Sequence, residues 1–197
     1  MKKLILLALV LFSSISLFAE KKVASYTLFG EEKEIEAYVN KKGELCIFIE
    51  VLGEYKNDRV MINVDGDKNI TALATAWKEV KEKFIEWLDV AKKNNVTNFN
   101  KEYPTTFPRC QIWWTGTKWR STYTGSYLKP RFMVLEDGTS STTCGGTAKD
   151  YDNQYITQKW YQIFQSPDEI QTLIDALDPQ QIRKVLDGDV EADALFQ

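Results

Sequence analysis

The sequence predicts an α+β protein in which antiparallel β-meander strands pack against one long amphipathic helix and a shorter C-terminal helix pair. Three observations predict this class. Residues 69–94 repeat apolar side chains at helical spacing, and most other segments read as β-strands. Turn sequences such as Asn-Lys-Lys-Gly at residues 40–43 separate those segments. Each half of the chain runs several strands and then a helix, which is consistent with a strands-then-helix pseudo-repeat.

The first residues have the pattern of a secretory signal peptide. Two lysines at residues 2–3 and a short apolar run at residues 4–12 precede Ala19, a suitable last residue before cleavage. Cleavage after Ser16 is the alternative, because a leucine stands where the Ala19 site prefers a small residue. The apolar run is shorter than a membrane-spanning helix. We therefore expect a periplasmic or secreted protein with no transmembrane segment once residues 1–19 are removed; a retained anchor helix is the alternative.

The rest of the chain is long enough for one domain with its own apolar core. We expect a single α+β domain over residues 20–186, with halves at residues 20–94 and 110–186. An acidic tail at residues 187–197 is expected to be frayed.

The first half is expected to be a four-stranded meander followed by the long helix. Its strands are predicted over residues 23–29, 34–39, 45–52 and 59–64. The third is apolar at nearly every position, which predicts a central strand covered on both faces. The helix that follows carries Trp77, Phe84 and Trp87 on its apolar face, and Asn69 is its expected N-cap.

The second half begins with a polar, proline-punctuated stretch at residues 95–109, which predicts a surface loop. The strands that follow are expected over residues 111–114, 117–123, 127–136, 139–144 and 155–164. The glycine pair at residues 145–146 is expected to end the fourth of these strands. Ser166 then caps a helix that begins at Pro167, and a second short helix restarts at Pro179.

The composition excludes several functions. The chain has 25 Lys and Arg, 28 Asp and Glu and no histidine, so Ser-His-Asp and Cys-His catalysis and His-ligated zinc are excluded. Scattered lysines on a mildly acidic chain argue against nucleic-acid binding. No motif indicates a cofactor or a resident metal. A carboxylate-based hydrolase remains chemically allowed. Glu50, within an apolar strand, is its nearest candidate residue, and a solvent-facing position is the simpler interpretation.

The turn at residues 65–69, Asp-Gly-Asp-Lys-Asn, begins like a calcium-binding loop. An EF-hand needs Gly at its sixth position and Glu at its twelfth, and those places hold Ile70 and Ala76. We therefore favour a tight turn with Gly66 over the alternative of a partial calcium site.

Aromatic residues crowd into residues 113–132, interleaved with Lys and Arg. Exposed rings beside cations can stack on sugar rings or hold a peptide. The candidate ligand-binding residues are Trp113, Trp119, Arg120 and Tyr123. The alternative is that these rings only form cross-strand pairs that hold a hairpin together.

The three cysteines are Cys46, Cys110 and Cys144. An exported chain meets an oxidising environment, so we expect a Cys110–Cys144 disulfide, because both residues lie beside turn or loop sequence. Cys46 lies within an apolar strand and is expected to be a small buried residue.

Together these observations favour an exported, non-enzymatic binding or interaction domain. Its partner is expected to be an envelope protein, a peptide or a glycan, engaged through surface aromatics. The alternatives are a His-free hydrolase that uses carboxylates on envelope glycans or peptides, and a structural envelope protein with no small ligand.

Overall fold

The computed structural model describes residues 20–115, 119–122 and 126–194, so the predicted signal peptide lies outside the described residues. Within these ranges the chain forms eleven β-strands and three α-helices, and the predicted α+β class is confirmed. The first strands are β1 (Lys21–Leu28), β2 (Glu31–Val39), β3 (Leu45–Gly53) and β4 (Val60–Asp65), which precede α2 (Asp67–Lys93). The next strands are β5 (Phe99–Glu102), β6 (Arg109–Thr115), β7 (Trp119–Ser121), β8 (Ser126–Tyr127) and β9 (Arg131–Val134). The last elements are β10 (Ser140–Lys149), β11 (Thr157–Phe164), α3 (Pro167–Ala176) and α4 (Pro179–Ala194).

The strands form one antiparallel sheet in the order β5-β9-β10-β11-β3-β4-β6-β7, with β2 also paired to β3 and β1 to β2. Both halves of the chain therefore share β3. Its first part pairs with β2, and its last residues, Leu52 and Gly53, pair with β11. A β-bridge joins Thr122, just after β7, to Asp150, just after β10. Because β7 and β10 are far apart in the strand order, the sheet must curl until these two places meet.

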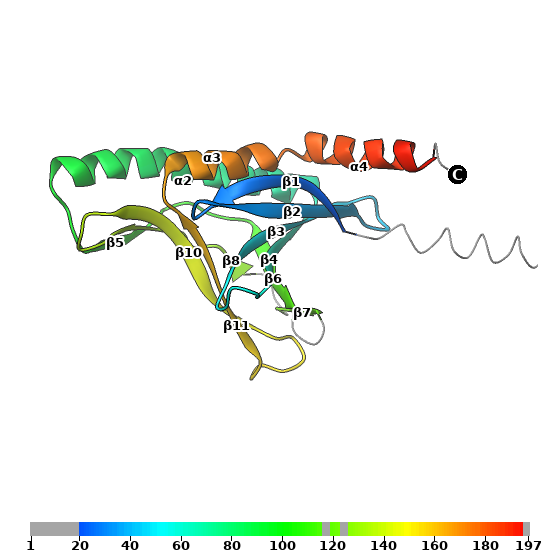
Figure 1. The fold of residues 1–197 in the computed structure, drawn as a ribbon, viewed down its shortest axis with the longest axis horizontal. Helices are drawn as coiled ribbons and strands as arrows, with labels where there is room; N and C mark the ends of the chain where they lie inside the picture. The colour runs from blue at the N-terminus through cyan, green and yellow to red at the C-terminus, as the bar shows by residue number, and fades with distance from the viewer. Residues whose placement is uncertain (1–19, 116–118, 123–125, 195–197) are drawn as a thin grey trace, which may run out of the picture.

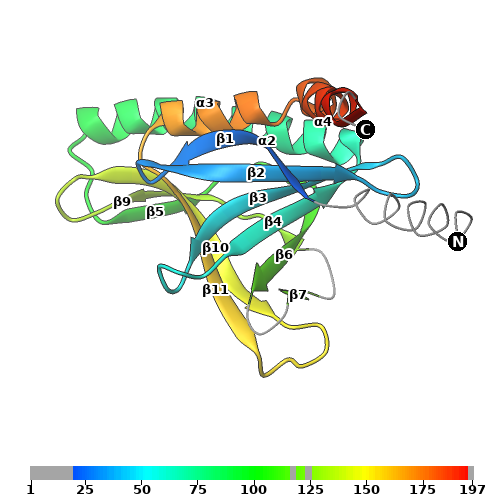
Figure 2. The same cartoon turned by 45° about the vertical axis from the view of Figure 1, so that its right-hand side comes forward.

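The helices lie together on one side of this sheet, and the turn between β10 and β11 lies at the far end of the molecule (Figures 1 and 2). The apolar face of α2 is buried as its spacing predicts, with Trp77 and Phe84 fully inaccessible. Trp77 packs edge-on against Phe164 of β11 with ring centres 5.0 Å apart, and Phe84 packs on Phe132 of β9 at 5.9 Å. Each buried ring contributes roughly 1.5–3 kcal/mol to stability. Buried residues of β1–β4 join the same cluster, so the core forms between α2 and both halves of the sheet.

The start of α2 differs from the prediction. The helix begins at Asp67, and its N-cap is Gly66 at φ 87° with no side-chain cap, whereas Asn69 donates its side-chain N–H to the carbonyl of Asp65 at 2.8 Å. A positive φ is accessible to glycine at little cost, so Gly66 makes the turn from β4 into the helix. The side chain of Asp67 is already engaged by an arginine, so the structure gives no support to a partial calcium site at this turn.

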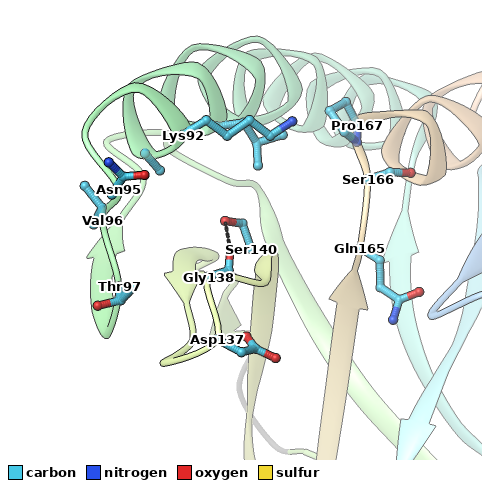
Figure 3. Close-up of a pocket in the computed structure, with 12 residues that line it drawn as sticks. Lys92, Asn95, Val96, Thr97, Asp137, Gly138, Ser140, Gln165, Ser166 and Pro167 are labelled. Atoms are coloured by element: carbon cyan, nitrogen blue, oxygen red, sulfur yellow. Dashed lines mark hydrogen bonds between the residues drawn. The ribbon is translucent and has the colours of Figure 1, made fainter.

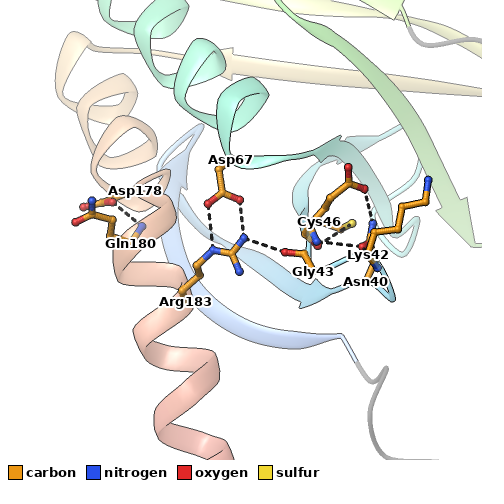
Figure 4. A network of polar contacts seen from close by, with 9 residues as sticks. Asn40, Lys42, Gly43, Cys46, Asp67, Asp178, Gln180 and Arg183 are labelled. Carbon is orange, nitrogen blue, oxygen red and sulfur yellow. Dashed lines mark hydrogen bonds and ion pairs between the residues drawn. The ribbon is translucent and has the colours of Figure 1, made fainter.

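That arginine is Arg183 of α4, and it fastens the last helix to the body of the protein (Figure 4). Its guanidinium donates to both carboxylate oxygens of Asp67, at 2.7 and 3.1 Å, and to the carbonyl of Gly43 at 3.3 Å. The acidic stretch predicted to fray instead continues α4 as far as Ala194. A bidentate guanidinium–carboxylate contact fixes the relative orientation of its two groups better than a single hydrogen bond does. It therefore orients α4 across the β2–β3 turn.

Two further predictions in the second half are wrong. The stretch read as a loop contains β5, an edge strand whose residues are all exposed, and such a strand lacks the alternation that reveals strands in a sequence. The pair Gly145-Gly146 does not end β10, which continues to Lys149 beside β11. The predicted start of α3 is confirmed, since the hydroxyl of Ser166 accepts the backbone N–H of Glu169. Among the described residues no helix has the length and apolar character needed to cross a membrane.

Candidate functional site

The structure places Trp113 on the sheet face opposite α2, where it is partly buried. Its ring stands at 90° to Phe48 with centres 5.6 Å apart, and Phe48 in turn stacks on Tyr38 at 6.1 Å. The indole N–H donates to the side-chain oxygen of Gln111 at 3.2 Å. Trp113 therefore forms part of a row of packed rings from β2, β3 and β6, in which the Phe48 and Trp113 rings meet although β4 lies between their strands.

The other candidate residues are separated. Arg120 on β7 pairs with Asp150 at 2.8 Å, and its side chain is only 16% exposed, so its charge is used internally. Trp119 belongs to β7, but its side chain is not described, and Tyr123 lies outside the described residues. Arg120 nevertheless marks an important place, because its partner Asp150 begins the turn between β10 and β11.

The predicted Cys110–Cys144 disulfide is absent, and all three cysteines are buried thiols. Cys110 lies on β6 and Cys144 on β10, strands that are not neighbours in the sheet. Burial and, to a smaller extent, the nearby Cys144 thiol raise the pKa of Cys110 to about 12. Burial also raises the pKa of Cys46 to about 11. Thiols with such pKa values stay protonated at neutral pH, which makes them poor nucleophiles.

Four tyrosines that the sequence did not single out are exposed on the β3–β4 loop, the β10–β11 turn and β11. Tyr155 is 88% exposed, Tyr55 70%, Tyr151 58% and Tyr161 38%. Tyr55 lies in the β3–β4 loop, Tyr151 and Tyr155 in the β10–β11 turn, and Tyr161 on β11. We call these four residues the tyrosine surface. A tyrosine in a polar turn has no sheet face to bury its ring, and this signal was available in the sequence around Tyr55 and Tyr151.

The β10–β11 turn that carries two of these tyrosines is held by Asp150. One carboxylate oxygen accepts the backbone N–H groups of Asp152 and Asn153 at 2.8 and 2.9 Å, and the other accepts the Arg120 guanidinium. The Arg120 hydrogen bond lowers the pKa of Asp150 below its usual value, so the carboxylate stays ionised. The backbone N–H of Tyr151 also donates to the carbonyl of Ser121 at 3.0 Å. The start of the turn is therefore fixed to β7 through the two neighbouring residues Asp150 and Tyr151.

The β3–β4 loop is tied to β11 in the same way. The Gln158 amide donates to Asp58 at 2.8 Å, and the Lys159 ammonium pairs with Glu54 at 2.8 Å. Lys159 also interacts electrostatically with the phenol groups of Tyr161 and Tyr55, which raise its pKa after the larger effect of Glu54. Tyr55 and Tyr161 are therefore both near Lys159, although they are 106 positions apart in the sequence.

A groove of about 660 Å³ lies near the opposite end of the sheet, between the end of α2, the β9–β10 turn and the start of α3 (Figure 3). Lys92 extends along its helix side, Asn95 and Thr97 form one wall, and Ser166 and Pro167 face them across the opening. The volume is in the range of ligand pockets, but none of the residues that line it is aromatic.

The groove also lacks the geometry of a carboxylate-based active site. Its only lining carboxylate is Asp137, whose pKa the backbone N–H of Thr139 holds below the usual value. An ionised carboxylate with no acidic partner in the groove cannot serve as the general acid of a two-carboxylate mechanism.

Glu50, the carboxylate proposed from the sequence, is engaged elsewhere. Glu50 accepts the backbone N–H of Glu34 at 3.3 Å and lies 4.0 Å from the Lys33 ammonium. Burial and the nearby Glu36 raise the pKa of Glu20, but Glu36 is itself paired with an arginine. No described group of three or more Cys, Asp or Glu is arranged to hold a metal ion.

Comparisons of the chain with protein-family models, with curated proteins and with solved structures found no match. The functional argument therefore depends on the residues themselves.

Proposed function

We propose that this protein is an exported, non-enzymatic binding domain that engages a component of the cell envelope through the tyrosine surface. The observation that carries the proposal is the exposure of Tyr161 on β11 and of Tyr55, Tyr151 and Tyr155 on loops fixed by internal hydrogen bonds and ion pairs. Tyrosine offers a large contact area at a small loss of conformational entropy, and loops on a rigid β scaffold commonly bind ligands. Export is supported by the signal-peptide pattern of residues 1–19.

This proposal moves the predicted binding residues from Trp113 to the tyrosines at the same end of the sheet. A ring that packs on Phe48 and bonds to Gln111 stabilises the fold, whereas a ring that is 88% exposed contributes little to stability and is available to a partner.

Co-sedimentation with isolated envelopes of the producing cells tests the proposal. The purified protein, residues 20–197, should sediment with envelopes, and the double variant Tyr55→Ala/Tyr155→Ala should stay in the supernatant while keeping its unfolding midpoint. Tyr127→Ala is the matched control, because Tyr127 is 53% exposed but lies on β8. Equal sedimentation of all three proteins, or none with the wild type, would overturn the proposal. The N-terminal residue of protein recovered outside the cytoplasm tests export, and an uncleaved, retained chain would contradict it.

A further inference from the structure

The outer side of the β10–β11 hairpin carries Tyr161, one residue of the tyrosine surface. Tyr161 pairs across the strands with Gly145, which is exposed and has no side chain. A Cβ atom placed on Gly145 would lie 2.6 Å from the carbonyl oxygen of Trp160 and 3.0 Å from Cδ1 of Tyr161. Contacts this short are essentially never seen, so only glycine fits at this position. The Tyr161 ring lies against the backbone of Gly145, and Tyr161 remains 38% exposed.

A tyrosine ring that lies beside a glycine on a sheet offers a flat aromatic surface to solvent, and the strand holds it in place. Hydrogen-bonding groups surround it. Thr147 is exposed opposite Lys159 on the neighbouring strand, and Lys159 with its partner Glu54 lies close to the phenol of Tyr161. The surface therefore combines an aromatic face with a hydroxyl, a carboxylate and an ammonium group.

The charges at this place favour an uncharged ligand. The Lys159 ammonium is neutralised by Glu54 at 2.8 Å, and the Asp58 carboxylate is occupied by the Gln158 amide. Phosphate-rich polymers require several unneutralised cations, so a nucleic acid is disfavoured although its bases could stack on the rings. The most exposed large apolar residues described here are all tyrosines, and the neighbouring aliphatic residues Leu52 and Ile156 are only partly exposed, which disfavours an apolar peptide.

We infer that the tyrosine surface binds a neutral glycan, with the Tyr161 ring stacked on the apolar C–H face of a sugar and Lys159 and Glu54 bonding to its hydroxyls. This inference rests on the proposed function and names the ligand class of the same surface. Tyr155 lies six residues from Tyr161, at most about 20 Å along the hairpin. A separation within that limit would let the two rings contact different sugars of one linear chain.

Titration with linear hexasaccharides of glucose, N-acetylglucosamine, xylose and mannose, followed by calorimetry, tests the inference on residues 20–197. At least one of these neutral oligosaccharides should bind. Tyr161→Phe keeps the aromatic ring and should keep the affinity within about threefold, whereas Tyr161→Leu keeps bulk over Gly145 without an aromatic face and should bind roughly tenfold more weakly. Tyr127→Ala is again the control, and circular dichroism checks that each variant is folded.

The outcomes separate this inference from the proposed function. If no hexasaccharide binds while the envelopes still retain the protein through Tyr55 and Tyr155, the glycan assignment is overturned and the binding domain stands. Equal affinity of the Tyr161→Leu and Tyr161→Phe variants would also overturn it, because the aromatic ring would then contribute nothing. If neither oligosaccharides nor envelopes bind, both proposals fail.

Discussion

Replacing Glu169 by alanine tests the contact that fastens α3 to the β1–β2 turn. The carboxylate accepts the backbone N–H of Gly30 at 2.7 Å and that of Gln165 at 2.6 Å, and the residue is only 8% exposed. A hydrogen bond to a charged acceptor contributes roughly 1.5–3 kcal/mol. Because Gly30 lies in an exposed turn where water can replace the carboxylate, we take the lower value for each bond and expect a loss of about 3 kcal/mol. For a domain of this size, that loss lowers Tm by roughly 6–12 °C.

Urea denaturation followed by tryptophan fluorescence measures this change. The slope of the free energy of unfolding against urea concentration should stay the same. Asp168→Ala is the matched control, since Asp168 is exposed in the same first turn and its loss should cost about 0.5 kcal/mol of helix-dipole interaction. Glu169→Gln keeps one acceptor oxygen and should fall between the two. A loss below about 1 kcal/mol for Glu169→Ala, or equal losses for Glu169→Ala and Asp168→Ala, would refute the reasoning.

Two further predictions concern the reactivity of the thiols and the loss of stability at acid pH. Burial raises the pKa of Cys46 to about 11 and those of Cys110 and Cys144 to about 12, so at pH 8 a thiol reagent should modify the native protein far more slowly than the urea-unfolded chain. The unfolded chain should give three equivalents, and fewer, or rapid reaction of the native state, would contradict the reduced, buried arrangement. Hydrogen bonding to Arg183 lowers the pKa of Asp67, so the pair stabilises the fold above the unfolded-state pKa and this stabilisation is lost as pH falls through the lowered value. Asp67→Asn should therefore flatten the dependence of stability on pH as the pH falls below the ordinary pKa of an aspartate, roughly 4. An unchanged dependence would contradict a stabilising role for the contact.

Much of the fold could be predicted because its signals are local. The helix around Trp77 and Phe84 follows from apolar spacing, the start of α3 from the Ser166-Pro167 pair, and the doubly buried β3 from its continuous apolar run. Each of these features needs only neighbouring residues and the geometry of one helix or strand.

The candidate site could be predicted only in part. The end of the sheet around Arg120 was identified by its aromatic composition. Alternation along one strand, however, does not reveal which face of the sheet other side chains cover. Trp113 meets Phe48 across the sheet, whereas Tyr161 meets a glycine and stays open. The cysteine pairing failed for a related reason, since turn sequence beside Cys110 and Cys144 says nothing about whether a bond forms between them.

The sequence by itself determined the class of fold, the long helix, the cap of α3 and several turns, and it excluded histidine chemistry. Only the tertiary structure decided that β3 joins both halves, that the sheet curls until Thr122 meets Asp150, and that Tyr55 and Tyr161 are both near Lys159. The physical reason is distance along the chain. Helical spacing and turn chemistry act over a few residues, whereas strand order and the meeting of two distant loops depend on the packing of the whole core.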